Sequence, residues 1–448
     1  MLQIESITAR IAALDPVRRF GRVTALGGGL ITIAGLAARA SIGDRVRFEC
    51  GLGGEVVRLG PEGAVALAEG GLDGLGVGAL AELEPPPAIA PHDGWLGRVV
   101  DCFGRPLDGR PLAGGGAPRG FRAAPPAAAS RRRLGPRLDT GLAVLDTLLP
   151  LVRGQRIGLF AGSGVAKSTL LGDLARGVDC DVAVIALIGE RGRELREFVE
   201  EVLGPEGLAR SVIVAATSDQ SPLLRRRCAW AAMAVAEHFR DAGRHVLLLA
   251  DSVTRFAEAH RETALAAGEA PSYRGFPAST AHLIMALAER AGPGPEGAGD
   301  ITGVFSVLVA GSDMEEPVAD ILRGVLDGHV VLDRAIAERG RFPAIDVLRS
   351  VSRSLPAAAT LHENALITRA RALLGAYARS EVMIRAGLYA PGNDTELDEA
   401  VRLHPALDRF VGERAACAAE SFALLEAALG GAAPVPAGAA GRRAEKPA

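Results

Sequence analysis

The sequence predicts an α/β protein with a mostly parallel sheet core, a small N-terminal β-barrel and a C-terminal helical domain. Three observations support this prediction. Short β-type runs with Gly-rich turns fill residues 21–88, buried strands alternate with helical patterns over residues 89–356, and helix-favouring Ala, Leu, Glu and Arg dominate residues 357–430. With 448 residues, 48% of them apolar, the chain is long enough for two or three domains.

The N-terminal region combines an amphipathic segment with the predicted barrel. Four apolar residues within residues 1–20 recur at intervals of three and four: Ile4, Ile7, Ile11 and Leu14. This spacing indicates a helix with one apolar face, which docks either on a partner or on its own domain. Runs such as Leu30 to Ala34 then predict barrel strands, and Glu84-Pro-Pro-Pro87 marks a linker.

The C-terminal region reads as helices followed by a tail. Residues Ala365 to Ala386 predict a long helix, and Ala390-Pro-Gly-Asn393 interrupts the pattern. Residues 431–448, in which charge punctuates Ala, Gly and Pro, predict a flexible tail. In the middle region, residues 113–133 predict a surface loop, whose last three arginines we expect to be solvated rather than to bind a partner.

The amino-acid composition narrows the possible partners, the cysteine chemistry and the cellular location of the protein. The net charge of −3 gives no reason to expect nucleic acid as a partner. Five cysteines without paired or metal-ligand spacing indicate reduced thiols. No apolar stretch reaches membrane-spanning length, and the N-terminus lacks a signal core, so we expect a cytoplasmic protein.

Residues 157–171, IGLFAGSGVAKSTLL, read as a buried strand, a small-residue loop and the start of a helix. Gly162 and Gly164 permit a curled loop whose N–H groups point inward, and the helix dipole adds positive potential. Lys167 would reach the β and γ phosphates of a nucleotide, and the Ser168 hydroxyl would hold Mg²⁺. The predicted cradle comprises Ala161, Gly162, Ser163, Gly164, Val165, Ala166, Lys167, Ser168 and Thr169.

Two alanines depart from the phosphate-loop pattern, which has glycine at the positions of Ala161 and Ala166. An ordinary strand-to-helix turn is therefore an alternative for this segment. A methyl group at Ala166 would cost ~1 to 3 kcal/mol if it strains the loop, and little if the loop has a negative φ there.

Two further strand ends carry carboxylates. Asp251 ends the apolar run from His245, and Glu190 follows the run from Val182 to Ile188. The carboxyl ends of parallel strands lie at one edge of a sheet, where ligands bind. We therefore expect Lys167, Asp251 and Glu190 to lie at one edge, with Asp251 facing a metal-bound water.

Residues 343–352, PAIDVLRSVS, match the signature segment of the α/β ATPases of rotary and export machines. The chain is identified as a member of that family, and the resemblance, which runs from about Gly21 to about Glu413, implies a P-loop, RecA-like core. Further segments resemble the flagellum-specific export ATPase branch: Gly94 to Gly109, Asp251 to Arg255, Arg274 to Pro277, Asp313 to Pro317, Leu326 to His329, and Leu403 to Pro405.

The resemblance implies an ATP- and Mg²⁺-dependent site with specific roles. Glu190 corresponds to the glutamate that orients the attacking water, and its alternative is an ion pair with Arg191 or Arg193. Arg255 resembles the arginine that reaches the γ phosphate, and Arg191 is a weaker candidate. In the same resemblance Phe342 aligns with the aromatic residue that stacks on adenine, with a core phenylalanine as the alternative. The family's branch also accepts alanine at Ala161.

Arg353 stands where the family presents an arginine finger to the neighbouring subunit's nucleotide. Such a finger contributes about 10³-fold or more to the rate. One chain carries both Glu190 and Arg353, so a ring of identical subunits, a homohexamer, would complete every site. The alternative is an arginine that caps a helix or pairs with Asp346.

The resemblance also implies partners and a location. These are a stator-like regulatory subunit at the N-terminus, a coiled-coil stalk subunit in the ring, the export gate, and exported flagellar proteins with their chaperones. The protein would be cytoplasmic and peripherally associated with the inner-membrane export apparatus.

Flagellar type III export is the leading function. The alternatives are an injectisome-type secretion ATPase, a rotary synthase subunit, and a nucleotide-bound scaffold ring with little turnover, which Ala166 motivates. An RNA-translocating hexamer shares the core fold, but the chain lacks a basic, aromatic-rich surface segment.

Overall fold

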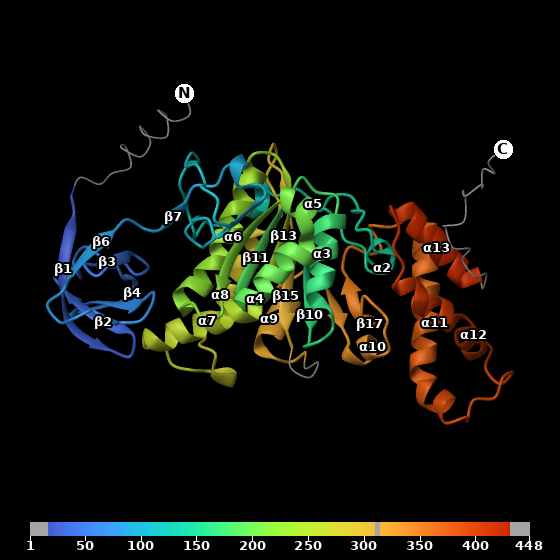
Figure 1. Cartoon of the computed structure of the whole chain (residues 1–448). Coiled ribbons are helices and arrows are strands. Elements are labelled where there is room, and N and C mark those ends of the chain that lie inside the picture. The colour runs from blue at the N-terminus through green and yellow to red at the C-terminus, as the bar shows by residue number, and fades with distance from the viewer. Residues whose placement is uncertain (1–16, 310–313, 431–448) are drawn as a thin grey trace, which may run out of the picture.

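The computed structural model describes residues 17–309 and 314–430, and it confirms the predicted fold class (Figure 1). A closed β-barrel precedes a mostly parallel sheet covered by helices, and a helical domain follows it. Most of the predicted N-terminal helix within residues 1–20, and the tail at residues 431–448, lie outside the described residues. The domain boundaries stay predictions.

Six antiparallel strands form the barrel in the order β1-β2-β5-β4-β3-β6, and pairing of β1 with β6 closes it. The strands are β1 (Arg19–Gly27), β2 (Leu30–Ala34), β3 (Arg45–Phe48), β4 (Gly53–Gly60), β5 (Gly63–Ala68) and β6 (Leu80–Glu84). Alternate residues such as Ile31, Ile33 and Val46 are fully buried, because a barrel strand points every second side chain inward.

The core sheet has the strand order β17-β16-β10-β15-β13-β11-β12-β8, with β14 beside β15. All pairs are parallel except β16–β17 and β14–β15. The strands are β8 (Arg98–Val100), β10 (Arg156–Ala161), β11 (Val182–Glu190), β12 (Ser211–Thr217), β13 (His245–Asp251), β14 (Gly292–Pro293), β15 (Asp300–Leu308), β16 (Gly328–Leu332) and β17 (Ile345–Ser352). A separate short pair, β7 (Ala88–Ile89) with β9 (Arg119–Gly120), lies outside this sheet.

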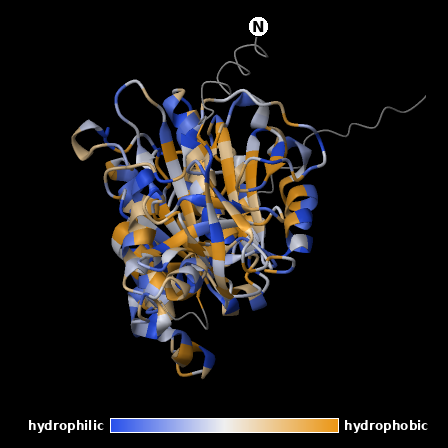
Figure 2. Ribbon diagram, turned by 90° about the vertical axis from the view of Figure 1, so that its left-hand side faces the viewer, coloured by the Kyte–Doolittle hydropathy of each residue, from blue (hydrophilic) through white to orange (hydrophobic). Residues whose placement is uncertain are grey.

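Helices cover both faces of the core sheet, which explains why its strands are continuous apolar runs (Figure 2). In β11, Ile185 and Leu187 pack against the side of α3 (Lys167–Gly177), whereas Val184 and Ala186 pack against the side of α6 (Pro222–Asp241). The core helices are α2 (Ala143–Asp146), α3 (Lys167–Gly177), α4 (Gly192–Glu197), α5 (Gly204–Ala209), α6 (Pro222–Asp241), α7 (Val253–Ala266), α8 (Ser279–Arg290), α9 (Pro317–Val325) and α10 (Arg334–Glu338).

The C-terminal domain consists of α11 (Leu361–Arg385), α12 (Thr395–Val411) and α13 (Ala418–Gly430). A capping box between Thr360 and Glu363 starts α11. Arg414, between α12 and α13, donates to Asp173 of α3 at 2.6 Å. The helix that begins at the phosphate loop is therefore tied directly to this domain.

Buried ion pairs fix the barrel to the core. Glu55 of the barrel is 4% exposed and accepts from Arg226 at 2.7 Å and from Arg227 at 2.8 Å, both on α6. Arg227 also donates to Glu69 of the barrel at 2.7 Å. Separating the barrel from α6 would leave these buried charges without partners, which is energetically costly. The pairs therefore favour a fixed position of the barrel against the core.

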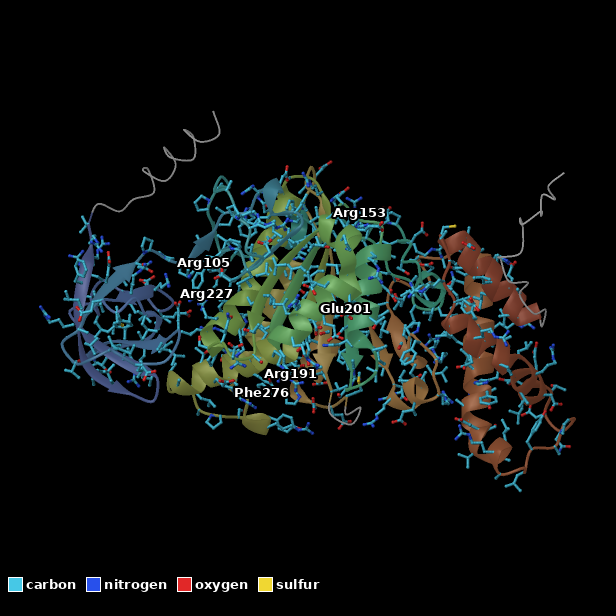
Figure 3. All side chains as sticks on the ribbon, viewed as in Figure 1. Arg105, Arg153, Arg191, Glu201, Arg227 and Phe276 are labelled. Atoms are coloured by element: carbon cyan, nitrogen blue, oxygen red, sulfur yellow. The ribbon has the colours of Figure 1, made fainter. Side chains whose placement is uncertain are left out.

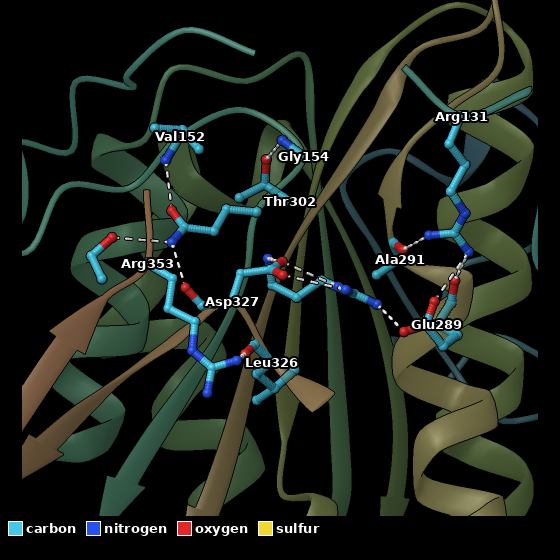
Figure 4. Close-up of polar contacts among 12 residues, drawn as sticks. Arg131, Val152, Gly154, Glu289, Ala291, Thr302, Leu326, Asp327 and Arg353 are labelled. Carbon is cyan, nitrogen blue, oxygen red and sulfur yellow. Dashed lines mark hydrogen bonds and ion pairs between the residues drawn. The ribbon is translucent and has the colours of Figure 1, made fainter. Parts of the chain in front are cut away.

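The prediction that the arginines ending the 113–133 loop are solvated is wrong for Arg131, whereas Arg132 is exposed and also pairs within the protein. Arg131 donates to the backbone oxygens of Glu289 and Ala291, and its side chain is only 16% exposed (Figure 4). Arg132 pairs with Asp300 at 2.6 Å. The loop crosses the edge where β15 begins, and the carboxylate buried there requires cations.

None of the helices in the described part of the chain has both the length and the apolar character needed to cross a membrane.

Candidate active site

The phosphate loop connects β10, which ends at Ala161, to α3, which begins at Lys167. No side chain caps the N-terminus of α3. The exposed residues of this turn are small or hydroxylic: Ser163, Gly164, Ser168 and Thr169. The first N–H groups of a helix have no partner within the helix, and the dipole there is positive, so this turn fits an anion such as a phosphate.

Ala166 has φ +58° and ψ 36°, the left-handed conformation. The alternative of a negative φ at this position is therefore wrong. An L-residue with a side chain loses about 1 to 2 kcal/mol in this region, whereas glycine does not. The alanine thus places a small strain in the loop.

Lys167 forms an ion pair with Asp251, the last residue of β13. Ser306 of β15 also donates to Asp251 at 2.6 Å. The contact between Ser306 and Asp251 follows from the sheet order, because β15 lies between β10 and β13 and is therefore the direct neighbour of the strand that ends at Asp251. Sequence reasoning missed Ser306, and the available signal was a hydroxyl within the apolar carboxyl-terminal half of the strand.

Glu190 ends β11, the strand next to β13. Burial and the negative charge of Asp251 raise the pKa of Glu190 to about 7, although the positive charge of Lys167 opposes both effects. A hydrogen bond with Glu194 also favours the protonated form. Arg191, which sequence reasoning offered as a partner for Glu190, pairs instead with Glu194 at 3.1 Å. A carboxyl group with a pKa near neutrality is suited to proton transfer or to polarising water.

Arg255 lies in the first turn of α7, and its backbone N–H donates to the N-capping hydroxyl of Ser252. Its side chain pairs with Glu258 at 3.1 Å and packs against Gly189, where an added Cβ would lie 3.4 Å from the Cβ of Arg255. The Nε of Arg255 is buried and has no hydrogen-bond partner among the described residues. The structure therefore brings Lys167, Asp251, Glu190 and Arg255 to one edge of the sheet.

Phe342 lies at the same edge. It precedes β17, whose Ile345 pairs with Leu332, and Leu332 pairs with Ala161 at the start of the phosphate loop. The side chain is 49% exposed, so the alternative of a core phenylalanine is wrong. An exposed aromatic face beside the loop fits a stacked nucleobase.

Arg353 lies at the opposite edge, because β17 runs antiparallel to its neighbour and Arg353 follows its last residue. The guanidinium donates to the backbone oxygens of Leu326 at 3.0 Å and Arg323 at 3.2 Å, at the C-terminal end of α9. It therefore caps a helix, one of the two alternatives. The five steps along β10 from Arg156 to Ala161 span roughly 16 Å, so Arg353 does not reach the phosphate loop of its own chain.

The residues present fit a phosphate-bound cation better than a cation held by protein alone. Among the described residues there is no group of three or more His, Cys, Asp or Glu side chains that could hold a metal ion. The Ser168 hydroxyl would supply one hard oxygen ligand, and the Asp251 carboxylate would bind a second one, a water on the metal. Mg²⁺ is typically bound by few protein oxygens together with phosphate and water, so this ligand set fits Mg²⁺ with a nucleotide.

Comparison with known proteins agrees with this geometry. The nucleotide-binding domain of the ATP synthase alpha/beta family matches residues 141–352, and the T3SS EscN ATPase C-terminal domain matches residues 359–420. A flagellum-specific ATP synthase of Caulobacter vibrioides is 46% identical over 436 residues, which cover 94% of this chain and 98% of the relative.

Two solved structures have the same fold. The assembled ATPase EscN of the enteropathogenic E. coli type III secretion system superposes with a TM-score of 0.86 at 35% identity, over 91% of this chain and 100% of EscN. EscN in complex with its central stalk EscO gives a TM-score of 0.83 at 35% identity and the same coverage. The chain is therefore a P-loop ATPase of the ATP synthase alpha/beta family, in the branch that contains the flagellum-specific and type III secretion ATPases.

Proposed function

We propose that this chain forms a homohexameric ring that hydrolyses ATP and energises protein export through the flagellar type III secretion apparatus. One observation carries the proposal: Lys167, Asp251 and Glu190 gather at the carboxyl edge of the sheet, whereas Arg353 lies at the opposite edge. A site that needs all four residues is complete only when two copies adjoin.

Each residue at the carboxyl edge has a role in hydrolysis. The loop from Ala161 to Thr169 binds the phosphates through its N–H groups, and Lys167 and Arg255 neutralise the γ phosphate. Ser168, together with Asp251 through a water, would hold Mg²⁺, which supplies further charge neutralisation when bound. Glu190 in its ionised form orients and polarises the attacking water.

The adjoining copy supplies Arg353 as an arginine finger. A positioned guanidinium stabilises the charge that develops on the transferred phosphoryl group. The exposed Phe342 stacks on the adenine. Arg191, which pairs with Glu194, has at most an indirect part in the site.

The partners and location follow by similarity. EscN binds a central stalk, EscO, and we propose that this ring binds a coiled-coil stalk subunit in the same way. Residues 1–20 dock a stator-like regulatory subunit, and the ring delivers exported flagellar proteins and their chaperones to the export gate. It does so in the cytoplasm, at the inner-membrane export apparatus, and nucleic acid is not a partner.

Mixed rings test the shared site. Lys167→Ala destroys the phosphate-binding half, and Arg353→Ala destroys the finger half. Each variant alone should lose turnover by about 10³-fold or more. A co-assembled mixture should regain activity, because pockets with an intact Lys167 then meet copies with an intact Arg353. A mixture that co-assembles but stays inactive would contradict the shared site.

Two other functions remain as outcomes of further measurements. The left-handed Ala166 favours a scaffold ring with little turnover, and ATP binding without phosphate release at any protein concentration would support it. Injectisome-type use is distinguished in the cell, where deletion of the gene should abolish motility if the ring serves the flagellum.

A further inference from the structure

The turn between α9 and β16 holds Arg353 by two hydrogen bonds. The backbone N–H of Arg353 donates to the oxygen of Asp327 at 3.0 Å, and its guanidinium donates to the oxygen of Leu326 at 3.0 Å. Gly328 has φ +151°, and a Cβ there would lie 2.4 Å from the oxygen of Val351. The turn therefore packs closely against the end of β17, and its backbone oxygens hold both the main chain and the guanidinium of Arg353.

The carboxylate of Asp327 fixes this turn to β10. It accepts from the backbone N–H of Arg156 at 2.9 Å and from the Arg156 guanidinium at 3.2 and 3.3 Å (Figure 4). Arg156 in turn donates to Glu289 at 2.5 Å. Gln155 donates to the backbone oxygen of Asp327 and to Ser352, which precedes Arg353, both at 3.1 Å.

We infer that Asp327 is a positioning residue for Arg353 and that it acts on the ATP site of the adjoining copy, not on the site of its own chain. The inference depends on the proposed function, in which Arg353 is the finger. Asp327 anchors to the first residue of β10, and the last residue of that strand opens the phosphate loop. Strand β10 thus connects the phosphate loop of a copy to Asp327, which positions the arginine finger that the same copy contributes to its neighbour.

Asp327→Asn tests the inference, because asparagine keeps the shape but removes the charge that binds Arg156. Rings of this variant should turn over roughly 10²-fold more slowly, since a displacement of about 1 Å at a catalytic group has an effect of that size. ATP affinity should stay within about twofold, because the phosphate loop is untouched. A loss of affinity equal to the loss of turnover would contradict a positioning role.

Mixing separates a positioning role from general damage. Asp327→Asn mixed with Lys167→Ala should regain activity, because about a quarter of the interfaces in a random ring join an intact pocket to an intact finger. Asp327→Asn mixed with Arg353→Ala should not, because both copies then carry an impaired finger. Activity in both mixtures would overturn the inference while leaving the proposed function intact.

Two controls complete the experiment. Asp300→Asn removes a comparable carboxylate at the same edge, which pairs with Arg132 and Arg153, and should leave turnover within about twofold. Lys167→Ala mixed with Arg353→Ala must regain activity; if it does not, the proposed function fails rather than the role of Asp327. If Asp327→Asn fails to assemble, Asp327→Glu, which keeps the charge but moves it, should show the same pattern of mixing.

Discussion

At one edge of the core sheet, Asp300 accepts from Arg132 and Arg153, each at 2.6 Å, and is 5% exposed. At the other edge, the half-buried Glu190 interacts with a second carboxylate, the buried Asp251. Figure 3 places Arg153 near the first edge and Arg191 near the second. Both edges contain carboxylates. The carboxylate at the first edge pairs with two arginines, whereas the two carboxylates at the second edge share one lysine, Lys167.

The difference shows how one sheet supports both structure and chemistry. Charge pairs that satisfy each other hold strand ends together, and their positions do not depend on a ligand. Carboxylates that share one lysine keep an unfavourable electrostatic energy, which a nucleotide with a cation can relieve. We therefore expect substitutions at the carboxyl edge to change turnover. Substitutions at the opposite edge should change either the stability of the fold or the position of Arg353.

Glu190→Gln should produce the largest difference in turnover between a substitution at the carboxyl edge and one at the opposite edge. If Glu190 polarises the attacking water, its amide should lower the turnover number by about 10² to 10⁴-fold while ATP still binds. Phosphate release and equilibrium ATP binding measure the two quantities. Asp300→Asn, measured in parallel, should leave turnover nearly unchanged. Equal losses of turnover in the two variants would remove the functional distinction between the edges.

The pH dependence should give the next largest effect. The pKa of Glu190 is raised from 4.5 to about 7 by burial and by Asp251. Because the ionised form orients water, kcat/KM should fall about tenfold per pH unit below pH 7, and Glu190→Gln should lack this limb. If wild-type protein and Glu190→Gln showed the same fall of kcat/KM below pH 7, the fall would come from the titration of another group.

The shifted pKa of Glu190 also predicts a stability trend. A raised pKa favours the protonated form in the folded state, so the destabilisation is absent below about pH 4.5 and fully present above about pH 7. Wild-type protein should therefore lose stability relative to Glu190→Gln as pH rises through this window. Thermal unfolding of both proteins across the window measures the difference.

The sequence predicted the fold and the gathering of Lys167, Asp251 and Glu190 from local patterns. Apolar runs that end in polar residues define parallel strand ends, and parallel strand ends share an edge. Ser306 could not be assigned, because its contact with Asp251 depends on β15 lying between β10 and β13. Strand order is a property of the whole chain.

Arginines were the least predictable residues. Arg131 and Arg132 were expected in solvent, yet they bind groups more than 150 positions away in the sequence. Asp327 likewise has a role that only its contacts with Arg156 and Arg353 indicate. A charged side chain in a loop carries no local signal of its partner.

Asp300→Asn should reduce stability moderately. The substitution leaves two guanidinium groups without their carboxylate, which should lower the free energy of unfolding by about 1 to 3 kcal/mol. The loss should stay below that of a fully buried pair, because the Arg132 and Arg153 side chains are 41% and 34% exposed. Denaturant unfolding measures it, and an unchanged midpoint would show that these pairs do not stabilise this edge.

The smallest effect concerns the strain at Ala166. Glycine adopts φ +58° without the penalty of about 1 to 2 kcal/mol that alanine carries, but it loses more backbone entropy on folding. Ala166→Gly should therefore gain about 1 kcal/mol, a factor of about five, divided between the free energy of unfolding and that of ATP binding. Measuring both quantities shows whether the strain is present before the nucleotide binds.

Gly164→Ala is the matched control for this gain. Gly164 has φ +77° in the same loop, and a Cβ there would meet no protein atom within 4 Å, so in the nucleotide-free protein the substitution changes only the backbone preference. It should lose about the same 1 kcal/mol that Ala166→Gly gains. A loss in the control without any gain at Ala166 would mean that the loop accommodates alanine at no cost. Backbone strain would then make no contribution at the carboxyl edge, where Glu190 and Asp251 share the charge of Lys167.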